Sequence, residues 1–169
     1  MCSDFLGGHM YGRRVPTVVR PMSDEELEAW LPRVREAYAH DMVENAGADN
    51  EGARAKADAD VERLFPGGVR SAAQLVYAIE SDGAYIGELW LAEQETPFRR
   101  VLWIYDVHVD DEHRGQGHGR AAMLFAEAEA RRLGLPGVAL NVFGGNDAAR
   151  GLYRSLGYIE EAVYMTKLV

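Results

Sequence analysis

The chain has 169 residues, of which 47% are hydrophobic and 27% charged, and its formal net charge is -9. A chain of this length can bury a full core without disulfides or metals. The acidic balance argues against nucleic acid as a partner, because phosphate binding needs a basic face. No apolar run approaches the roughly twenty residues that cross a bilayer. We therefore expect one soluble domain with neither a nucleic-acid nor a membrane partner.

The N-terminal segment carries little information about the fold. Residues 1–14 lack the apolar core of a signal peptide, and Gly8-His9-Met10 matches a vector scar. We assign residues 1–14 to a tag-derived or disordered segment and residues 15–169 to the domain. One cysteine, Cys2, excludes an internal disulfide framework and predicts a reducing, cytoplasmic location.

The first half of the domain predicts a strand followed by two helices. Residues 15–20 alternate weakly, and Ser23-Asp24-Glu25-Glu26 is typical of a capping box that begins a helix. Pro32 fits this helix poorly unless it begins a second helical segment. A second helix over residues 51–64 ends at Pro66-Gly67-Gly68. The apolar positions of the first helix recur every three or four residues: Leu27, Trp30, Leu31, Val34, Tyr38 and Met42.

The second half predicts strands alternating with helices. Its strands cover residues 74–80, 84–93, 101–109, 138–142 and 158–168. A helix follows over residues 120–133, and another lies between a cap at Asn146 and a stop at Gly157. Ser81-Asp82-Gly83 predicts a hairpin turn. The pattern predicts an α/β (α+β) fold with a mixed, mostly antiparallel sheet and about four helices.

A glycine-rich loop joins the strand over residues 101–109 to the helix after it. Residues 107–120 read V-H-V-D-D-E-H-R-G-Q-G-H-G-R. Glycines at 115, 117 and 119 let the backbone turn sharply and approach a ligand closely. The first N–H groups of the following helix have no helical partner and attract anions. The loop therefore predicts a phosphate cradle.

Three other interpretations of the loop differ in how well they fit. A nucleotide P-loop needs Lys-Ser or Lys-Thr after its last glycine, but Arg120-Ala121 stands there. A dinucleotide fingerprint needs a different glycine spacing and a carboxylate about twenty residues on, where residues 136–140 offer none. A plain turn without a ligand would explain the glycines alone, but a second motif makes it less favourable.

That second motif spans residues 146–158 and reads N-x-x-A-x-x-L-Y-x-x-L-G-Y. Together with R-G-Q-G-H-G at 114–119, it resembles the two signature motifs of the GNAT superfamily of acyl-CoA-dependent N-acetyltransferases. The resemblance covers residues 101–158 well. It implies the GNAT fold, acetyl-CoA as acyl donor, and direct transfer of the acetyl group to a primary amine, which we expect to belong to a small molecule. The family usually ends in two antiparallel strands, whereas the twelve residues after Gly157 predict one long or bulged strand.

The resemblance also implies which residues hold acetyl-CoA. The backbone of Val107 and Val109 would pair with the pantetheine arm. Asn146 would bond that arm or its phosphate end, although it could equally only cap a helix, and Ala149 would leave room for the cofactor. His113 and His118 have no partners at metal-ligand spacing, so we expect no metal site and solvent-facing imidazoles. The pyrophosphate would lie on the loop formed by Arg114, Gly115, Gln116, Gly117, His118, Gly119 and Arg120.

For catalysis, the resemblance implies Val107 N–H as the oxyanion donor and Tyr153 as the proton donor to the departing thiolate. The general base stays open among Asp106, Glu88, His108 and a water relay. Asp106 and His108 share one face of their strand by the period of two. Asn141 is a further candidate to orient the acceptor.

Two alternative functions remain open from the sequence. One is acetylation of a protein, at its N-terminus or at a lysine. The other is a non-catalytic sensor that binds acyl-CoA. A homodimer is compatible with the resemblance, since dimers are common in the family, and the acceptor is not identified by the sequence.

Overall fold

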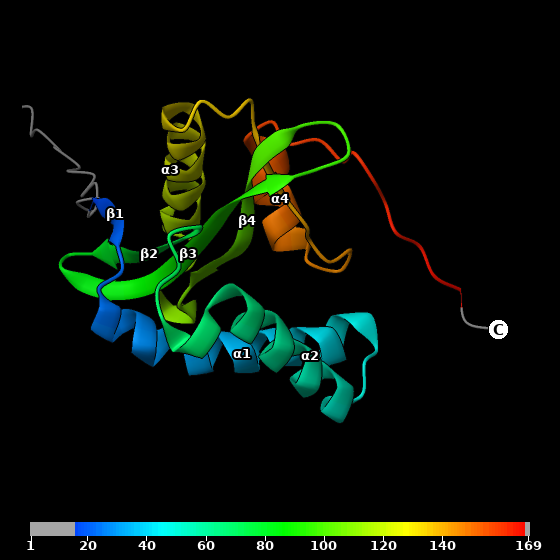
Figure 1. Cartoon of the computed structure of the whole chain (residues 1–169). Coiled ribbons are helices and arrows are strands. Elements are labelled where there is room, and N and C mark those ends of the chain that lie inside the picture. The colour runs from blue at the N-terminus through cyan, green and yellow to red at the C-terminus, as the bar shows by residue number, and fades with distance from the viewer. Residues whose placement is uncertain (1–15, 168–169) are drawn as a thin grey trace, which may run out of the picture.

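The computed structural model describes residues 16–167, which form one mixed sheet with four α-helices around it (Figure 1). The strands follow the order β1-β2-β3-β4-β5, antiparallel except for the parallel pair β4–β5. They are β1 (Thr17–Pro21), β2 (Gln74–Ser81), β3 (Ala84–Glu95), β4 (Arg100–Val109) and β5 (Val138–Leu140). The helices are α1 (Asp24–Ala46), α2 (Asn50–Leu64), α3 (His118–Arg132) and α4 (Asp147–Ser155). This arrangement confirms the predicted fold class.

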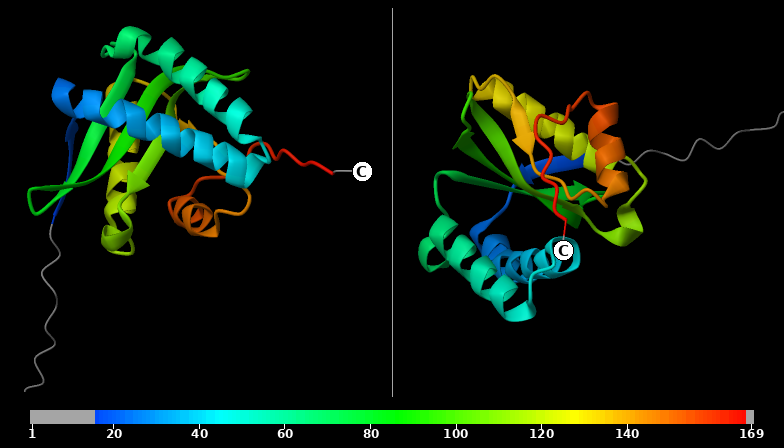
Figure 2. Two further views of the ribbon diagram at one scale, coloured as in Figure 1. Left: turned by 90° about the horizontal axis from the view of Figure 1, so that it is seen from below. Right: turned by 90° about the vertical axis from the view of Figure 1, so that its right-hand side faces the viewer.

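The sheet separates two apolar cores. Helices α3 and α4 pack on one face, and α1 and α2 cover the other (Figures 1 and 2). On the α1 side, the rings of Trp30, Phe65 and Trp90 meet with centroid distances of 5.3 to 5.8 Å. Aromatic contacts of this kind bury large areas, so this cluster fixes α1 and the end of α2 on strand β3.

Helix α1 begins as the sequence predicts. The Ser23 hydroxyl accepts from the N–H of Glu26, and the Glu26 carboxylate accepts from the N–H of Ser23, which confirms the capping box. Arg20 also pairs with Glu26 and helps to hold the pKa of that carboxyl down at about 2. Pro32 does not start a second segment, because α1 continues through it. Pro32 and Glu28 both lie on the exposed face of α1, so the helical hydrogen bond that the proline cannot donate to the Glu28 carbonyl is missing at the surface and not in the core.

Two sequence predictions about the domain fail. Tyr38 is an exposed residue whose hydroxyl bonds the Asp60 carboxylate, so it is not part of the core. The strand predicted over residues 158–168 is also wrong, since residues 158–167 contain no regular secondary structure. The physical reason is that this segment has no hydrogen-bonded neighbouring strand, without which alternating apolar residues do not form a β-ladder.

Some predictions concern residues that the structure does not describe. Residues 1–15, including Cys2, and residues 168–169 lie beyond it, so the assignment of residues 1–14 to a terminal segment stays a prediction. Among residues 16–167, no helix is long and apolar enough to cross a membrane.

Candidate active site

A bulge opens the sheet between β4 and β5. Trp90 of β3 pairs with Asp106, while the next residue, Leu91, pairs with Ile104, so Tyr105 is the extra residue on β4. Strand β5 pairs with β4 only from Leu102 to Ile104. Beyond the bulge, β4 therefore continues without β5 beside it.

The backbone of β4 beyond the bulge faces this opening. The N–H of Asp110 donates to the carbonyl of Ile86 at 2.9 Å. Hydrogen-bonded pairs alternate along an antiparallel ladder, so the N–H and C=O groups of Val107 and Val109 point away from β3. The carbonyl of Val109 instead accepts from Arg114 Nε at 2.8 Å. Both valines thus present their main chain to the space where β5 has diverged, as a ligand that binds like a strand would require.

The glycine-rich loop ends in an uncapped helix. Gly115 and Gly117 adopt φ values of 74° and 95°, in the left-handed region that side chains rarely enter. Helix α3 begins at His118, two residues earlier than predicted, and no side chain among residues 16–167 caps it. The first helical bond runs from Ala121 N–H to the Gly117 carbonyl. The N–H groups of His118, Gly119 and Arg120 precede that bond and remain available to an anion.

The polar side chains of the loop bond to the protein itself. Arg114 pairs with Asp111 at 2.6 Å, Gln116 donates to the Glu112 carbonyl, and Arg120 donates to Ser155 on α4 at 2.5 Å. The main chain of the loop, rather than its cations, is therefore the part best placed for a phosphate. Arg120 also ties α3 to α4, which carries Tyr153.

The imidazole of His118 is not solvent-facing, contrary to the sequence prediction. It is 4% exposed, and its Nδ1 lies 2.8 Å from the Thr17 hydroxyl on β1. Burial lowers the pKa of His118. A periodic pattern could not show this, because the residue that covers the ring lies 101 positions away. Within residues 16–167, no group of three His, Cys, Asp or Glu side chains is arranged to hold a metal.

Asp106 is half-buried on the α1 side of the sheet, in the same ladder as Glu88 and His108. Burial, followed by the negative charge of Glu88, raises the pKa of Asp106 to about 7. The charge of His108 and a hydrogen bond from the Val107 amide act in the opposite direction. A carboxyl group with such a pKa can exchange a proton near neutral pH.

Glu88 belongs to a hydrogen-bonded chain that the sequence did not indicate. Its side chain is buried and accepts a hydrogen bond from the Tyr85 hydroxyl, which in turn accepts from Arg33 of α1 at 3.2 Å. Period-two reasoning would place Tyr85 and Glu88 on opposite faces. A second bulge, in which Ile86 is skipped between the pairs of Gly87 and Tyr85, brings both side chains to the α1 side.

The residues on α4 complete the surroundings of the opening. Tyr153 is half-buried, and its pKa is raised first by burial and then by the charge of Asp106, which places the phenol within electrostatic reach of that carboxyl. Asn146 caps α4 by accepting from the N–H of Ala149 at 3.1 Å. Asn141 is exposed and lies just past the end of β5, not within a strand as predicted.

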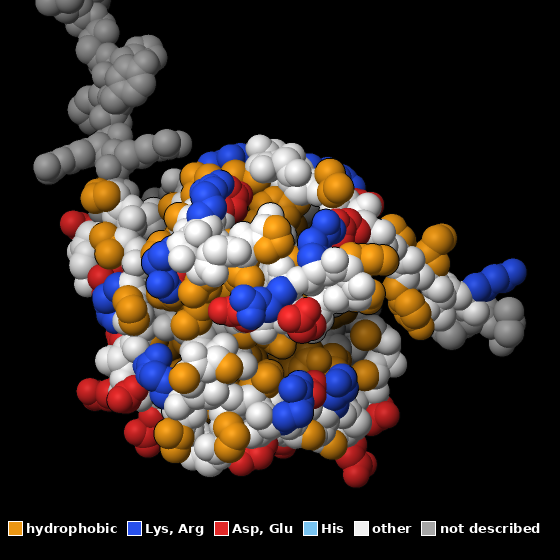
Figure 3. Space-filling model, turned by 45° about the horizontal axis from the view of Figure 1, so that its top comes forward, with side chains coloured by type: hydrophobic (Ala, Val, Ile, Leu, Met, Phe, Trp, Pro, Cys, Tyr) orange, Lys and Arg blue, Asp and Glu red, His pale blue; other side chains and the backbone are white. Residues whose placement is uncertain are grey.

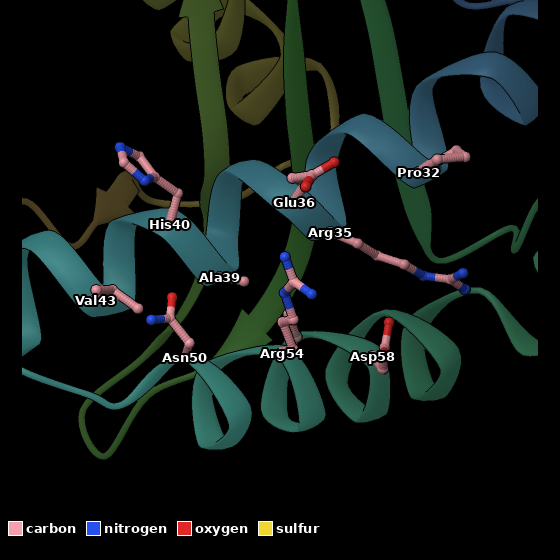
Figure 4. A pocket seen from close by; sticks show the side chains of 10 residues that line it. Pro32, Arg35, Glu36, Ala39, His40, Val43, Asn50, Arg54 and Asp58 are labelled. Atoms are coloured by element: carbon pink, nitrogen blue, oxygen red, sulfur yellow. The ribbon is translucent and has the colours of Figure 1, made fainter.

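A separate pocket lies between α1 and α2 (Figure 4). Charged side chains line it from both helices, among them Arg35, Glu36, Arg54 and Asp58. Its lining includes none of the predicted catalytic or acetyl-CoA-binding residues, which gather instead at the opening between β4 and β5.

Comparisons with known proteins identify the family of the chain. A model of the acetyltransferase (GNAT) family matches residues 27–158. YycN of Bacillus subtilis, called an uncharacterized N-acetyltransferase, is 28% identical over 152 residues, which cover 89% of this chain and 97% of YycN. The crystal structure of YycN has a TM-score of 0.81 at 25% identity and covers 91% of this chain and 99% of its own.

A more distant relative matches over a shorter stretch. The mycothiol acetyltransferase of Thermomonospora curvata is 38% identical over 88 residues, which cover 52% of this chain and 29% of that protein. The family model, in contrast, spans most of the present chain. It includes the glycine-rich loop, the motif at residues 146–158 and the strands β2 to β5. The chain therefore belongs to the acetyltransferase (GNAT) family and is an acyltransferase enzyme.

Proposed function

We propose that this enzyme transfers the acetyl group of acetyl-CoA to a primary amine of a small molecule by direct attack. One observation carries the proposal. The main chain of Val107 and Val109, which points away from β3, and the uncapped N-terminus of α3 flank the opening on which Asp106 and Tyr153 act. A donor that has both amide groups and a pyrophosphate needs these two kinds of partner.

The acetyl-CoA donor would bind largely through main-chain groups. The pantetheine amides would pair with Val107 and Val109 as a neighbouring strand does. The pyrophosphate would take the N–H groups of residues 115–120, where the helix dipole of α3 favours negative charge. The amide of Asn146 keeps its NH₂ group for this arm while its oxygen caps α4.

Asp106 is the general base in this proposal. A primary amine arrives protonated, since its pKa lies near 10. The Asp106 carboxylate takes one proton, after which the nitrogen attacks the thioester carbon and the C–S bond breaks as the C–N bond forms. The Val107 N–H stabilises the developing oxyanion, although in the ligand-free enzyme that N–H is shared with Asp106.

Tyr153 supplies a proton to the leaving thiolate. Its raised pKa keeps the phenol protonated at neutral pH, so that it is ready to donate. The second proton of the attacking nitrogen then restores the phenol. The products are an amide and a free thiol, and the charges balance with one proton released to solvent through Asp106.

A small cationic amine suits the α1 side of the opening. Glu88 and Asp106 provide negative charge there, and the rings of Trp90 and Tyr105 stack beside them at a centroid distance of 4.7 Å. Carboxylates and aromatic faces both attract ammonium groups. Protein acetylation remains the other candidate acceptor class, and a cytoplasmic location stays a prediction from the single cysteine.

The decisive experiment is a calorimetric titration with acetyl-CoA, using NADH and ATP as controls. Micromolar binding of acetyl-CoA alone supports the donor site. Thiol release is then measured with two acceptor panels, small amines and peptides with free N-termini or lysines. Turnover confined to peptides would overturn the small-molecule acceptor, and the absence of acetyl-CoA binding would overturn the whole proposal.

A further inference from the structure

Glu88 is the one acidic side chain that is buried among residues 16–167, where it is 8% exposed. Burial of a carboxylate is costly unless hydrogen bonds or a cation compensate for the lost water. Acidic side chains at the surface have such cations, and Figure 3 shows several of them beside basic side chains. The mechanism proposed for the transfer gives Glu88 no contact with the substrate. Its burial beside the opening therefore needs an explanation of its own.

The protein satisfies only one oxygen of this carboxylate. Glu88 Oε2 accepts a hydrogen bond from the Tyr85 hydroxyl, whereas Oε1 has no hydrogen-bond partner among residues 16–167. His108, which faces Glu88 across the ladder, lies instead with its Nε2 3.5 Å from Asp110 Oδ1. Oε1 is not one of the fully enclosed partnerless atoms in the described part of the chain, so it keeps contact with solvent. A carboxylate has about four acceptor positions, and a ligand with N–H donors can reach those on Oε1.

Tyr85 and Arg33 hold the other oxygen in place. Arg33 Nη2 donates to the Tyr85 hydroxyl oxygen at 3.2 Å. A guanidinium group donates but cannot accept, so the single proton of the phenol is committed to Glu88. The guanidinium carbon also lies 5.5 Å from the centroid of the Tyr85 ring, which adds a cation–π contact. Burial, followed by the hydrogen bond to Glu88, raises the pKa of Tyr85, so the phenol keeps this proton at neutral pH.

The carboxylate of Glu88 lies beside the proposed general base. In the antiparallel ladder, Glu88 pairs with His108 and Trp90 pairs with Asp106, so Glu88 and Asp106 are diagonal neighbours on one face. Diagonal neighbours are about 7–8 Å apart, which is within reach of long side chains. The charge of Glu88 is the second cause, after burial, of the raised pKa of Asp106, in agreement with this proximity. One ammonium nitrogen can therefore contact both carboxylates.

We propose that Glu88 binds the protonated amine of the acceptor through Oε1, and that Tyr85, supported by Arg33, is the positioning residue for this carboxylate. The inference rests on the proposed function for the acceptor side of the opening. The ammonium group donates to Glu88 and Asp106 together. Asp106 then takes one proton, and the nitrogen keeps its hydrogen bond to Glu88 while it attacks the thioester. The site thus selects aliphatic primary amines, which are charged in water, over aromatic amines, which are not.

A charged probe and an uncharged analogue of the same shape test the binding step without turnover. Tryptophan fluorescence follows the titration, since Trp90 pairs with Asp106, and it is measured with and without coenzyme A. The natural protein should bind n-butylammonium at least about tenfold more tightly than n-butanol. Glu88→Gln should weaken binding of n-butylammonium by about 10- to 100-fold and leave n-butanol unchanged. Tyr85→Phe, which keeps the ring, should weaken it by about 3- to 10-fold.

Two control variants remove the same chemical groups elsewhere. Glu95→Gln removes an exposed carboxylate of β3, and Tyr38→Phe removes a phenol hydroxyl that bonds the Asp60 carboxylate. Both should bind n-butylammonium as the natural protein does. Equal affinity of the natural protein for the two probes, or natural affinity for n-butylammonium in Glu88→Gln, would overturn the proposal. If Glu88→Gln loses its thermal unfolding transition, Tyr85→Phe decides in its place by the same criterion.

Kinetics distinguish recognition from chemistry and from a merely structural role. The acceptor is an alkylamine for which thiol release is observed, and the pH is 8, above the pKa of Asp106 of about 7. Glu88→Gln should raise KM for the amine by about 10- to 100-fold and change kcat by less than about threefold. A lower kcat at unchanged KM would contradict the proposal. If acetyl-CoA does not bind, the proposed function fails while binding of n-butylammonium that depends on Glu88 still supports the cation site; natural KM in Glu88→Gln has the reverse meaning.

Discussion

At the residue scale, the two carboxyl groups of the opening have different surroundings. Glu88 has the Tyr85 hydroxyl as a donor, and behind it Arg33, so its negative charge is supported. Asp106 is half-buried next to that charge, and burial together with the charge raises its pKa to about 7. A carboxyl group whose pKa lies near neutrality is typical of acid–base sites. The sequence could not choose the general base among the side chains of Asp106, Glu88 and His108, because the surroundings that distinguish the two carboxyl groups arise from burial and from a bulge.

The first prediction concerns the pH dependence of turnover. If Asp106 takes the proton of the amine, kcat/KM for the amine should rise with pH and level off above about pH 7. Asp106→Asn should lower kcat/KM by about 10²- to 10⁴-fold and remove that titration. Asp82→Asn, in the exposed hairpin turn, is the matched control and should keep the natural profile. An unchanged profile in Asp106→Asn would assign the base elsewhere.

The second prediction is that the same substitution, which lowers activity, raises the stability of the fold near neutral pH. The folded pKa of Asp106, about 7, exceeds its ordinary value of 3.8, so its contribution to stability is full below pH 3.8 and is lost as pH rises through 7. Asp106→Asn has no charge to bury. Relative to the natural protein, the variant should therefore gain up to about 4 kcal/mol in unfolding free energy between pH 4 and pH 8, since each pKa unit is worth about 1.4 kcal/mol. Urea titrations at the two pH values measure this, and an equal difference at both would refute the burial argument.

Tyr153 leads to a third prediction, which separates chemistry from binding. Tyr153→Phe keeps the ring and removes the proton donor, so kcat should fall by about 10²-fold while the affinity for acetyl-CoA stays near its natural value. Tyr158→Phe is the matched control. Its hydroxyl is buried without a hydrogen-bond partner in the described part of the chain, and its ring lies 5.9 Å from that of Tyr153. Natural turnover in Tyr153→Phe would exclude the phenol as the acid.

At the element scale, local signals proved predictable and irregularities of the sheet did not. The capping box at Ser23, the hairpin at residues 81–83 and the glycine-rich loop are each encoded by residues close in the chain, and the structure has all three. The bulges at Ile86 and Tyr105 leave no comparable local signal. They depend on pairing with a neighbouring strand, and they decide which side chains meet in the site.

The loop glycines provide the fourth prediction. Gly117 precedes α3 with φ of 95°, so Gly117→Ala should cost about 1–2 kcal/mol in unfolding free energy and weaken acetyl-CoA binding, because the strained loop would turn its N–H groups away from the phosphate. Gly151→Ala in α4 is the control. Its φ is not positive and its added methyl group meets open space, so it should be neutral or slightly stabilising. Calorimetry with acetyl-CoA and thermal unfolding compare the two. Equal affinity in both variants would exclude the loop from the donor site.

At the scale of the whole molecule, the sequence predicted the layers of the fold but not the course of its C-terminal end. Residues 158–168 have the composition of a strand, yet residues 158–167 form none in the single chain. Propensity describes what a segment can form, whereas a strand also needs a neighbour with free backbone groups.

The candidate site likewise depends on several elements at once, because β4, the start of α3 and α4 each supply one wall of the opening. A donor that contacts all three should stabilise the entire domain. At about a hundredfold excess over its dissociation constant, acetyl-CoA should add about 2.7 kcal/mol to the free energy of unfolding. For a chain of this size, that corresponds to a rise of roughly 5–10 °C in Tm. Hydrogen exchange should slow together at residues 107–109, in the loop at 114–120 and in α4. Protection limited to the loop would mean that only a phosphate is bound there and that β4 and α4 take no part in holding the donor.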